Sequence, residues 1–151
     1  MKMKVVEHRG HDEEYGDRYH PRTLLKPGKD TCYYSGTSHG PPNEDWLIFG
    51  VESVPYCITS IGIRNVGGWF DRAIKRISIE GSADNTEYED WMEIEGIEKG
   101  DDDLQSFEVD IASSEYAVIN KWKYYKICIL DNYGDEEENC FREFVLFGVA
   151  Q

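Results

Sequence analysis

The chain has 151 residues, a length that fits one domain with a sizeable hydrophobic core. Its formal net charge of −14 repels nucleic acid and anionic membranes at long range and favours neutral or cationic partners. Hydrophobic residues make up 40% of the chain and aromatic residues 13%, which excludes a disordered acidic chain.

The first 29 residues are polar and are interrupted by glycine and proline, so we expect loops there, and residues 1–10 allow a flexible N-terminal segment. From Thr31 onward, short apolar runs alternate with turn residues. The runs that we expect to form strands are 32–34, 46–51, 57–63, 74–79, 91–94, 107–111, 124–130 and 141–149. About eight short strands at this spacing predict a single all-β domain over residues 1–151, an antiparallel β-sandwich or barrel. The best helical candidate is the short segment 111–121.

The last two runs predict a hairpin that closes the sandwich. Tyr125, Ile127 and Ile129 alternate on one face, and the segment 131–134 supplies turn residues. Phe141, Val145 and Phe147 then resume the period of two. We therefore expect Phe147 to lie in the core.

Cysteine usage and the N-terminal sequence favour a soluble protein inside the cell. Cys32, Cys57, Cys128 and Cys140 fit small buried hydrophobes, although paired cysteines stay open because connectivity cannot be deduced from sequence. No apolar signal-peptide stretch follows the first residues, and no run approaches the roughly 20 apolar residues that span a bilayer. We expect a cytoplasmic or otherwise intracellular protein without membrane insertion.

Catalytic and metal motifs are weak in this sequence. The spacing of His8 and His11 invites zinc, but four ligands are needed and loop histidines without a metal are the better interpretation. The acidic runs 101–103 and 135–138 are typical of solvated loop tips. Asp131 and Glu143 could form a glycosidase pair, but nothing fixes their separation. Because no nucleophile or phosphate-loop motif is present, we expect no catalytic residues and no enzyme.

Five segments of the sequence form an ordered pattern. They are Thr31-Cys32-Tyr33, Trp46 to Phe49, Ile58 to Arg64, Ser82-Ala83-Asp84 with Trp91, and Tyr124 to Ile127 followed by Phe141 to Gly148. In this order the segments resemble the discoidin, or coagulation factor type C (F5/8 type C), family of galactose-binding-like domains. The resemblance covers about residues 15–148. It implies a β-sandwich jelly roll and points toward recognition rather than catalysis.

In that family, ligands usually meet loops at one end of the sandwich, and the matching loops here are 11–20, 26–31 and 65–72. The third loop is the most distinctive, because Trp69 and Phe70 follow two glycines and could stack on a ligand. The alternative is that Trp69 folds back to cap the sandwich. The residues that we expect to bind ligand are Tyr15, Arg18, Tyr19, Asp30, Arg64, Asn65, Trp69, Phe70, Asp71 and Arg72.

The resemblance also implies a structural calcium site in many members, and this chain departs from it. Lys26-Pro27-Gly28-Lys29 stands where the acidic loop would be, so only Asp30, Thr31 and Glu143 remain as oxygen ligands. Calcium prefers six to eight oxygens, several from carboxylates. We expect no cofactor and at most a weak calcium site.

The sequence therefore predicts a non-catalytic binding module. The resemblance favours carbohydrate, a galactose-type sugar or a glycan, as the ligand. An intracellular protein-interaction adaptor that uses the same loop face is the alternative, and a carboxylate-based glycoside enzyme is a distant third. The oligomeric state stays open.

Overall fold

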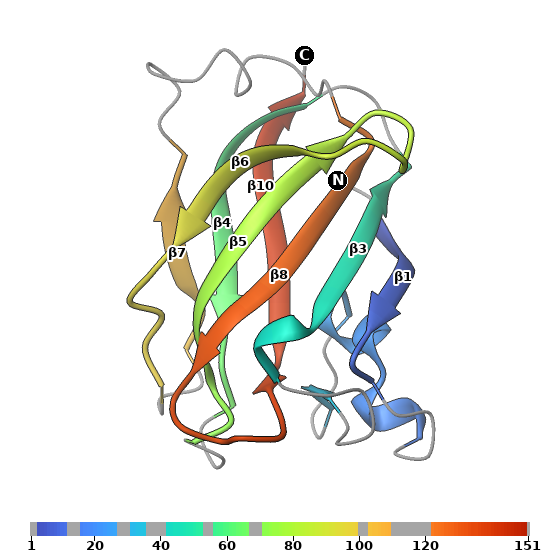
Figure 1. Ribbon diagram of the computed structural model, residues 1–151. Helices are drawn as coiled ribbons and strands as arrows, with labels where there is room; N and C mark the ends of the chain where they lie inside the picture. The colour runs from blue at the N-terminus through green and yellow to red at the C-terminus, as the bar shows by residue number, and fades with distance from the viewer. Residues whose placement is uncertain are drawn as a thin grey trace.

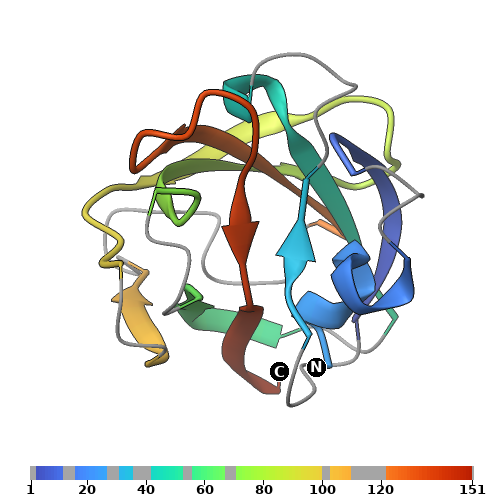
Figure 2. The same cartoon turned by 90° about the horizontal axis from the view of Figure 1, so that it is seen from below.

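The computed structural model describes residues 3–11, 16–26, 31–35, 42–52, 56–66, 71–99, 103–109 and 122–150. Two sheets face each other, and a small third sheet lies at one end (Figures 1 and 2). Every ladder between strands is antiparallel. The expected antiparallel β-sandwich is confirmed. The helical candidate 111–121 lies outside the described residues.

The larger sheet has the strand order β1-β3-β8-β5-β6 and the smaller sheet the order β10-β4-β7. The third sheet pairs β2 with β9. Short 3-10 turns, η2, η3 and η4, precede β2 and β3. The bounds are β1 Met3–Arg9, η2 Asp17–Tyr19, η3 Pro21–Leu24, β2 Tyr33–Tyr34, η4 Pro42–Glu44, β3 Trp46–Val51, β4 Tyr56–Arg64, β5 Ile74–Ser82, β6 Glu89–Ile94, β7 Gln105–Glu108, β8 Tyr124–Asn132, β9 Cys140–Phe141 and β10 Glu143–Ala150.

The N-terminal segment differs from the expected loops, because residues 3–9 form β1 at the edge of the larger sheet. Met3 and Val5 pack against the core, whereas Lys4 and Glu7 are exposed. The register with β3 shifts between Val5 and Glu7, which marks a β-bulge. The alternation before the bulge is too short to indicate a strand in sequence, so pairing with β3 decides the structure.

The core fills the space between the two sheets. Ile61 of β4 and Ile77 of β5 are fully buried, as are Tyr125 and Ile127 of β8, whose expected alternation is confirmed. Phe49 of β3 stacks on a phenylalanine of β10, Phe144, with ring centroids 5.2 Å apart and ring planes 11° apart. This stack joins the two sheets, since β3 and β10 belong to different ones.

The expected closing hairpin is wrong in two respects. Strand β8 pairs with β3 and β5 in the larger sheet, whereas β10 pairs with β4 in the smaller one. The inward side chains of β10 are Phe144 and Leu146, and Phe147 is 40% exposed. The short strand β9 explains the change of face, because Phe141 is buried in its own pairing with β2 and the alternation is interrupted at Arg142 before β10 begins.

The motif Ser82-Ala83-Asp84 forms the turn between β5 and β6. The Ser82 hydroxyl donates a 3.1 Å hydrogen bond to the Asp84 carboxylate, which also accepts from the backbone N–H groups of Thr86 (3.0 Å) and Glu87 (3.2 Å). These hydrogen bonds, led by those of Thr86, hold the pKa of Asp84 well below its usual range. The turn lies at the opposite end of the sandwich from β2 and β9 (Figure 1).

Candidate binding face at the loop end

One end of the sandwich gathers the segments that the sequence assigned to ligand loops. The register pairs Arg64 with Glu143 and Ile74 with Asn132, so β4 and β8 end there and β5 and β10 begin there. Strands β2 and β9 lie side by side at this end, seen in Figure 2, with η2 and η3 beside them. We call this surface the end face.

Two arginines and two tyrosines form a continuous row of contacts on the end face. The Arg18 guanidinium carbon lies 5.0 Å from the centre of the Tyr19 ring, and the Tyr19 and Tyr34 rings are 5.7 Å apart. The Arg72 guanidinium carbon lies 5.4 Å from the centre of the Tyr34 ring. We call these four residues the arginine–tyrosine ladder. It joins the first and third expected loops through Tyr34, a residue of β2.

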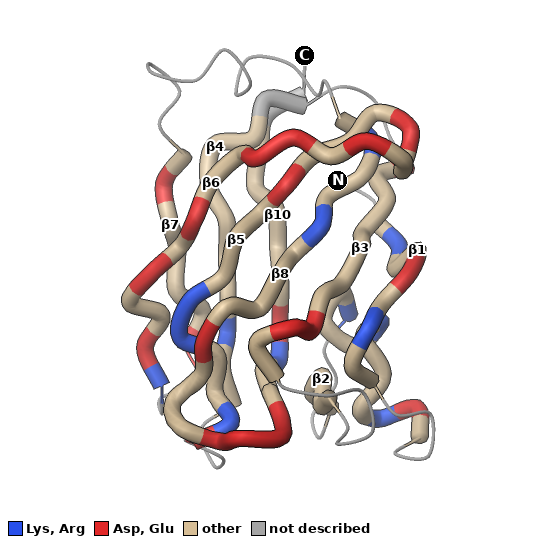
Figure 3. The backbone as a smooth tube through the Cα atoms, viewed as in Figure 1, with Lys and Arg blue, Asp and Glu red and all other residues tan. Residues whose placement is uncertain are grey.

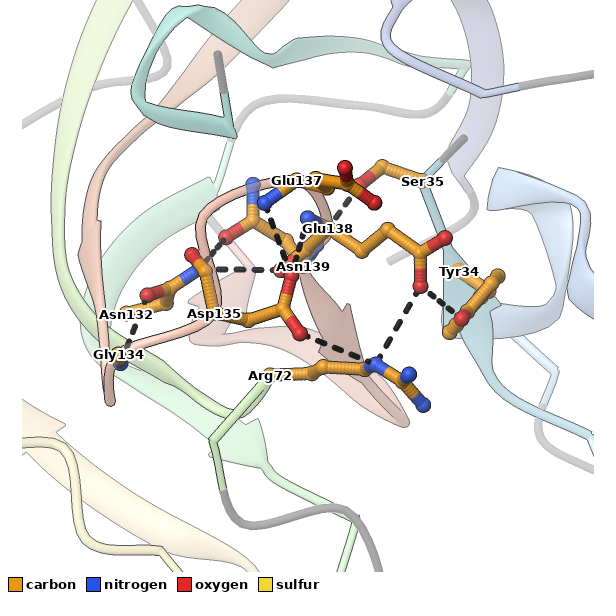
Figure 4. A network of polar contacts seen from close by, with 9 residues as sticks. All are labelled: Tyr34, Ser35, Arg72, Asn132, Gly134, Asp135, Glu137, Glu138 and Asn139. Carbon is orange, nitrogen blue, oxygen red and sulfur yellow. Dashed lines mark hydrogen bonds and ion pairs between the residues drawn. The ribbon is translucent and has the colours of Figure 1, made fainter. Parts of the chain in front are cut away.

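Two carboxylates hold Arg72 at the end of the ladder (Figure 4). The Arg72 Nε atom lies 3.4 Å from Asp135 Oδ2 and 3.3 Å from Glu138 Oε2. The Tyr34 hydroxyl donates a hydrogen bond to the same Glu138 oxygen. Because the Glu138 side chain is only 9% exposed, these contacts are shielded from water more than a surface ion pair is. They therefore fix both Arg72 and Tyr34.

A buried asparagine ties the acidic loop to the rest of the end face. Asn139 is fully buried, and its side-chain amide donates hydrogen bonds of 2.8 Å to Asp45 Oδ2 and to the Pro42 carbonyl. Its backbone N–H donates to the Ser35 hydroxyl at 2.7 Å. These three hydrogen bonds hold the end of the acidic loop against the segments around Ser35 and Asp45.

Two of the expected ligand residues, Arg64 and Asn65, have structural partners. Arg64 Nη2 lies 3.4 Å from Glu143 Oε2, across the β4–β10 pair. Asn65 is 1% exposed, and its amide donates to the carbonyls of Ile74 (3.0 Å) and Glu98 (2.8 Å) while its oxygen accepts from the Ile74 N–H (3.1 Å). Asn65 thus anchors the loop instead of facing solvent.

The structure brings other expected residues to the end face. Arg18, Tyr19 and Arg72 belong to the ladder, and Asp71 is exposed beside Arg72, with its carbonyl accepting from the Asp135 N–H at 3.0 Å. Four expected ligand residues lie outside the described residues. They are Tyr15, Asp30, Trp69 and Phe70.

The sequence interpretation missed Tyr34, Glu138 and Asn139. Tyr34 follows the buried Tyr33, and the period of two would have placed it on the open face of its strand. Glu138 was assigned to a solvated loop tip, which is wrong because it is buried against Arg72 and Tyr34. No local pattern in this acidic run separates Asp135 and Glu138, the carboxylates that meet a cation, from their solvated neighbours.

The residues implied for calcium fit the ion poorly. Glu143 is already paired with the Arg64 guanidinium, whose charge opposes a cation there. Thr31 is half-buried, and Asp30 lies outside the described residues. Across the described ranges, no group of three or more His, Cys, Asp or Glu side chains could hold a metal ion.

Three histidines meet beside the end face, one more than the sequence spacing suggested. The rings of His8, His11 and His20 lie edge to face, with centroids 5.3 to 5.7 Å apart. The His11 Nδ1 atom hydrogen-bonds to the Tyr34 carbonyl at 2.9 Å, and His20 Nδ1 accepts from the Arg22 N–H at 3.1 Å. The ring contacts join His8 of β1 to His11 and His20, and the His11 hydrogen bond joins this cluster to β2, which gives the histidines a packing role.

Two cysteines lie in contact under the end face. The buried Cys140 thiol donates to the Cys32 sulfur at 3.5 Å. This bond lowers the pKa of the Cys32 thiol, whereas burial raises the pKa of the Cys140 thiol. Cys32 is therefore the better nucleophile of the pair.

Oxidising the reduced protein with diamide, which takes up two electrons and is reduced to its hydrazine, is expected to join Cys32 and Cys140 in a disulfide. The Cys32 thiolate first adds to diamide. The Cys140 sulfur then attacks the Cys32 sulfur and releases the hydrazine, a step that the contact between the two sulfur atoms favours. A disulfide typically stabilises a fold by about 2 to 4 kcal/mol. Thiol titration after denaturation should show two thiols lost, and the Tm should rise. A Cys32→Ser variant should show neither change, and an unchanged thiol count in the parent would contradict the pairing.

No helix in the described part of the chain is long and apolar enough to cross a membrane.

The sequence of this chain matches one known protein family. The model of the Sad1/UNC-like C-terminal family matches residues 53–150. No curated protein matches the chain.

Solved structures match over almost the whole chain. The C-terminal domain of a chitobiase from Bacteroides fragilis is 21% identical, with a TM-score of 0.75, covering 99% of this chain and 95% of that one. The module CpGH89CBM32-5 from Clostridium perfringens, in complex with GalNAc-β-1,3-galactose, is 13% identical, with a TM-score of 0.73 and coverage of 97% and 95%. An F5/8 type C domain from Bacteroides fragilis is 14% identical, with a TM-score of 0.73 and coverage of 99% and 93%. At these identities the likeness shows the fold, and the expected galactose-binding-like sandwich is confirmed.

Proposed function

The chain belongs to the Sad1/UNC-like C-terminal family, and we propose that it is a non-catalytic, single-domain binding module that recognises carbohydrate through its end face. A structure of the same fold, CpGH89CBM32-5, is described in complex with GalNAc-β-1,3-galactose, which supports a galactose-type sugar or glycan as the first ligand to test. Fold alone does not assign a ligand, so the proposal depends on the chemistry of the end face.

The arginine–tyrosine ladder is the observation that carries the proposal. Tyr19 and Tyr34 are half-buried, so each ring keeps an accessible part that can stack on the C–H face of a sugar. The guanidinium groups of Arg18 and Arg72 lie beside these rings and can donate directional hydrogen bonds to hydroxyl or carboxylate groups. Because Arg72 is held by Asp135 and Glu138, ordering it on binding costs little.

The proposal includes the expected residues that the structure does not describe. Trp69 and Phe70 directly precede Asp71, and Asp71 and Arg72 lie at the end face. We propose that these two aromatics extend the ladder as ligand contacts, with Tyr15 and Asp30 contributing from the other two loops. Arg64 and Asn65 support the same surface from beneath.

Replacing Tyr19 with alanine is expected to weaken glycan binding by roughly 1 to 3 kcal/mol, the range for truncating an aromatic anchor. A glycan array with the purified protein first identifies the sugar, and calorimetry on parent and variant then gives the affinities. Tyr19 lies on a short 3-10 turn outside the core, so the Tm should change little. Tyr88→Ala, in the turn between β5 and β6 and away from the end face, is the matched control and should bind as the parent does. Equal losses in the two variants would contradict the assignment of the end face.

Membership of the Sad1/UNC-like family favours a second candidate, a protein-interaction domain that uses the same end face. Exposed arginines and tyrosines are also enriched in protein interfaces. Two results together would support this candidate over carbohydrate. The glycan array would show no bound sugar, and a partner protein would bind to the parent but not to the Tyr19→Ala variant.

A further inference from the structure

A separate cleft of about 800 Å³ opens between β1 and η3, on the flank of the sandwich. Its volume lies in the range of sites that hold a small organic molecule, roughly 300 to 1,000 Å³. The ladder residues do not line it. The cleft is therefore a second candidate site, independent of the proposed function.

The floor of the cleft is apolar. Met3 and Val5 of β1 and Leu25, which follows η3, line it and are only partly buried against the core. An apolar ligand body that covered these side chains would remove their remaining accessible surface from water. That burial is favourable by about 25 cal/mol per Å².

The rim of the cleft is cationic, in contrast to the chain as a whole. Lys4, Arg22 and Lys26 line it and are exposed, and His20 adds an imidazole. The described lining contains no acidic residue, although Asp and Glu occupy 30 of the 151 positions in the chain. Figure 3 shows both basic and acidic positions on β1 and on the neighbouring η2–η3 segment, whereas acidic positions dominate along β6 and the β8–β9 connection.

Two of the rim cations have exposed acidic partners that do not line the cleft. Arg22 Nη2 lies 2.7 Å from Asp17 Oδ1, and Lys4 Nζ lies 3.5 Å from Glu52 Oε1. Exposed pairs of this kind contribute about 0 to 1 kcal/mol, so they hold the cations only weakly. A ligand anion seated over the apolar floor can therefore compete for these cations.

We propose that this cleft binds a small amphipathic anion, a molecule with a carboxylate head and a hydrocarbon body. The head contacts Arg22 and Lys26 at the rim, and the body covers Met3, Val5 and Leu25. The net charge of −14 opposes any anion at long range, so selectivity for the anion arises from these local contacts. The Arg22 guanidinium offers the paired donors that a carboxylate accepts.

Calorimetric titration of the protein with decanoate, below its micelle concentration, tests the proposal, with decanol as the uncharged ligand of the same chain length. Decanoate is expected to bind about tenfold more tightly than decanol, the ratio expected from one charge-assisted contact. Equal affinities, or no binding of decanoate, would overturn the proposal. This comparison uses the parent protein alone and does not depend on a variant that folds.

A double variant, Arg22→Glu with Lys26→Glu, should remove the preference for decanoate and leave decanol binding unchanged. The matched control reverses two exposed lysines away from the cleft, Lys99→Glu with Lys123→Glu, and makes the same change in net charge. The control should keep the preference for decanoate. If the affinity for decanoate falls to the same extent in both double variants, the effect comes from net charge and the cleft assignment is wrong.

Discussion

Replacing Phe144 with alanine is expected to lower the free energy of unfolding by about 3 to 5 kcal/mol. Phe144 is 1% exposed and stacks on Phe49, so the change removes a buried ring and leaves a cavity between the two sheets. Close packing on both sides limits how far the structure can relax into that cavity. Urea unfolding of parent and variant, with equal m-values, measures the loss.

Phe147→Ala is the matched control on the same strand. Phe147 is 40% exposed, and its ring lies over Gly62, where an added Cβ would come 2.9 Å from a ring carbon. Its removal takes away surface packing only, so we expect a loss of about 1 kcal/mol. If Phe147→Ala lowers the free energy of unfolding as much as Phe144→Ala or more, then Phe147 faces the core, as the sequence alternation predicted, and the structural assignment of β10 is wrong.

Replacing Asn65 with alanine is expected to cost about 2 to 4 kcal/mol of stability. The amide makes three hydrogen bonds, two with Ile74 and one with Glu98, all to backbone groups. Alanine offers neither donor nor acceptor, and a buried polar group that loses its partner costs about 1 to 3 kcal/mol. Thermal and urea unfolding of the variant check this value.

The exposed residue Asn43 provides the control for Asn65. Asn43→Ala lies on η4 and should change stability by less than about 0.5 kcal/mol. Because Asn65 anchors the start of β5, its loss should also weaken ligand binding at the end face by more than the unfolded fraction explains. A stable Asn65→Ala protein would show that the loop is held by other contacts.

The sequence predicted the strands of this fold more reliably than their partners. The period of two in β8 identifies Tyr125, Ile127 and Ile129 as inward residues, because each faces the same core. The same pattern carries no information on which sheet a strand joins, so β8 and β10 were paired as a hairpin. Strand β1 was missed because its alternation is broken by a bulge and its stability comes from pairing with β3.

The end face could be predicted only in part. The resemblance of the loops placed Arg18, Tyr19 and Arg72 in one region, and the structure joins them through Tyr34. Glu138 and Asn139 could not be found in this way, since their roles depend on contacts with residues far away in sequence. Asn65 was assigned to the right loop. Whether such a polar residue contacts a ligand or supports the loop from beneath depends on its burial, and the sequence does not show burial.

The end face is built from contacts with very large separations in sequence. Tyr34 and Glu138 are 104 residues apart, as are Ser35 and Asn139, and Cys32 and Cys140 are 108 apart. A nascent chain that has left the ribosome as far as Asn132 already carries all five strands of the larger sheet, but it lacks β9 and the carboxylate that holds Tyr34. Bringing residues this far apart in sequence together is slow, because the chain loses entropy before any of the contacts between them can form. The proposed ligand recognition at this face therefore requires a chain that extends at least through β9, and we expect a fragment that is cut within the β8–β9 connection to lose it.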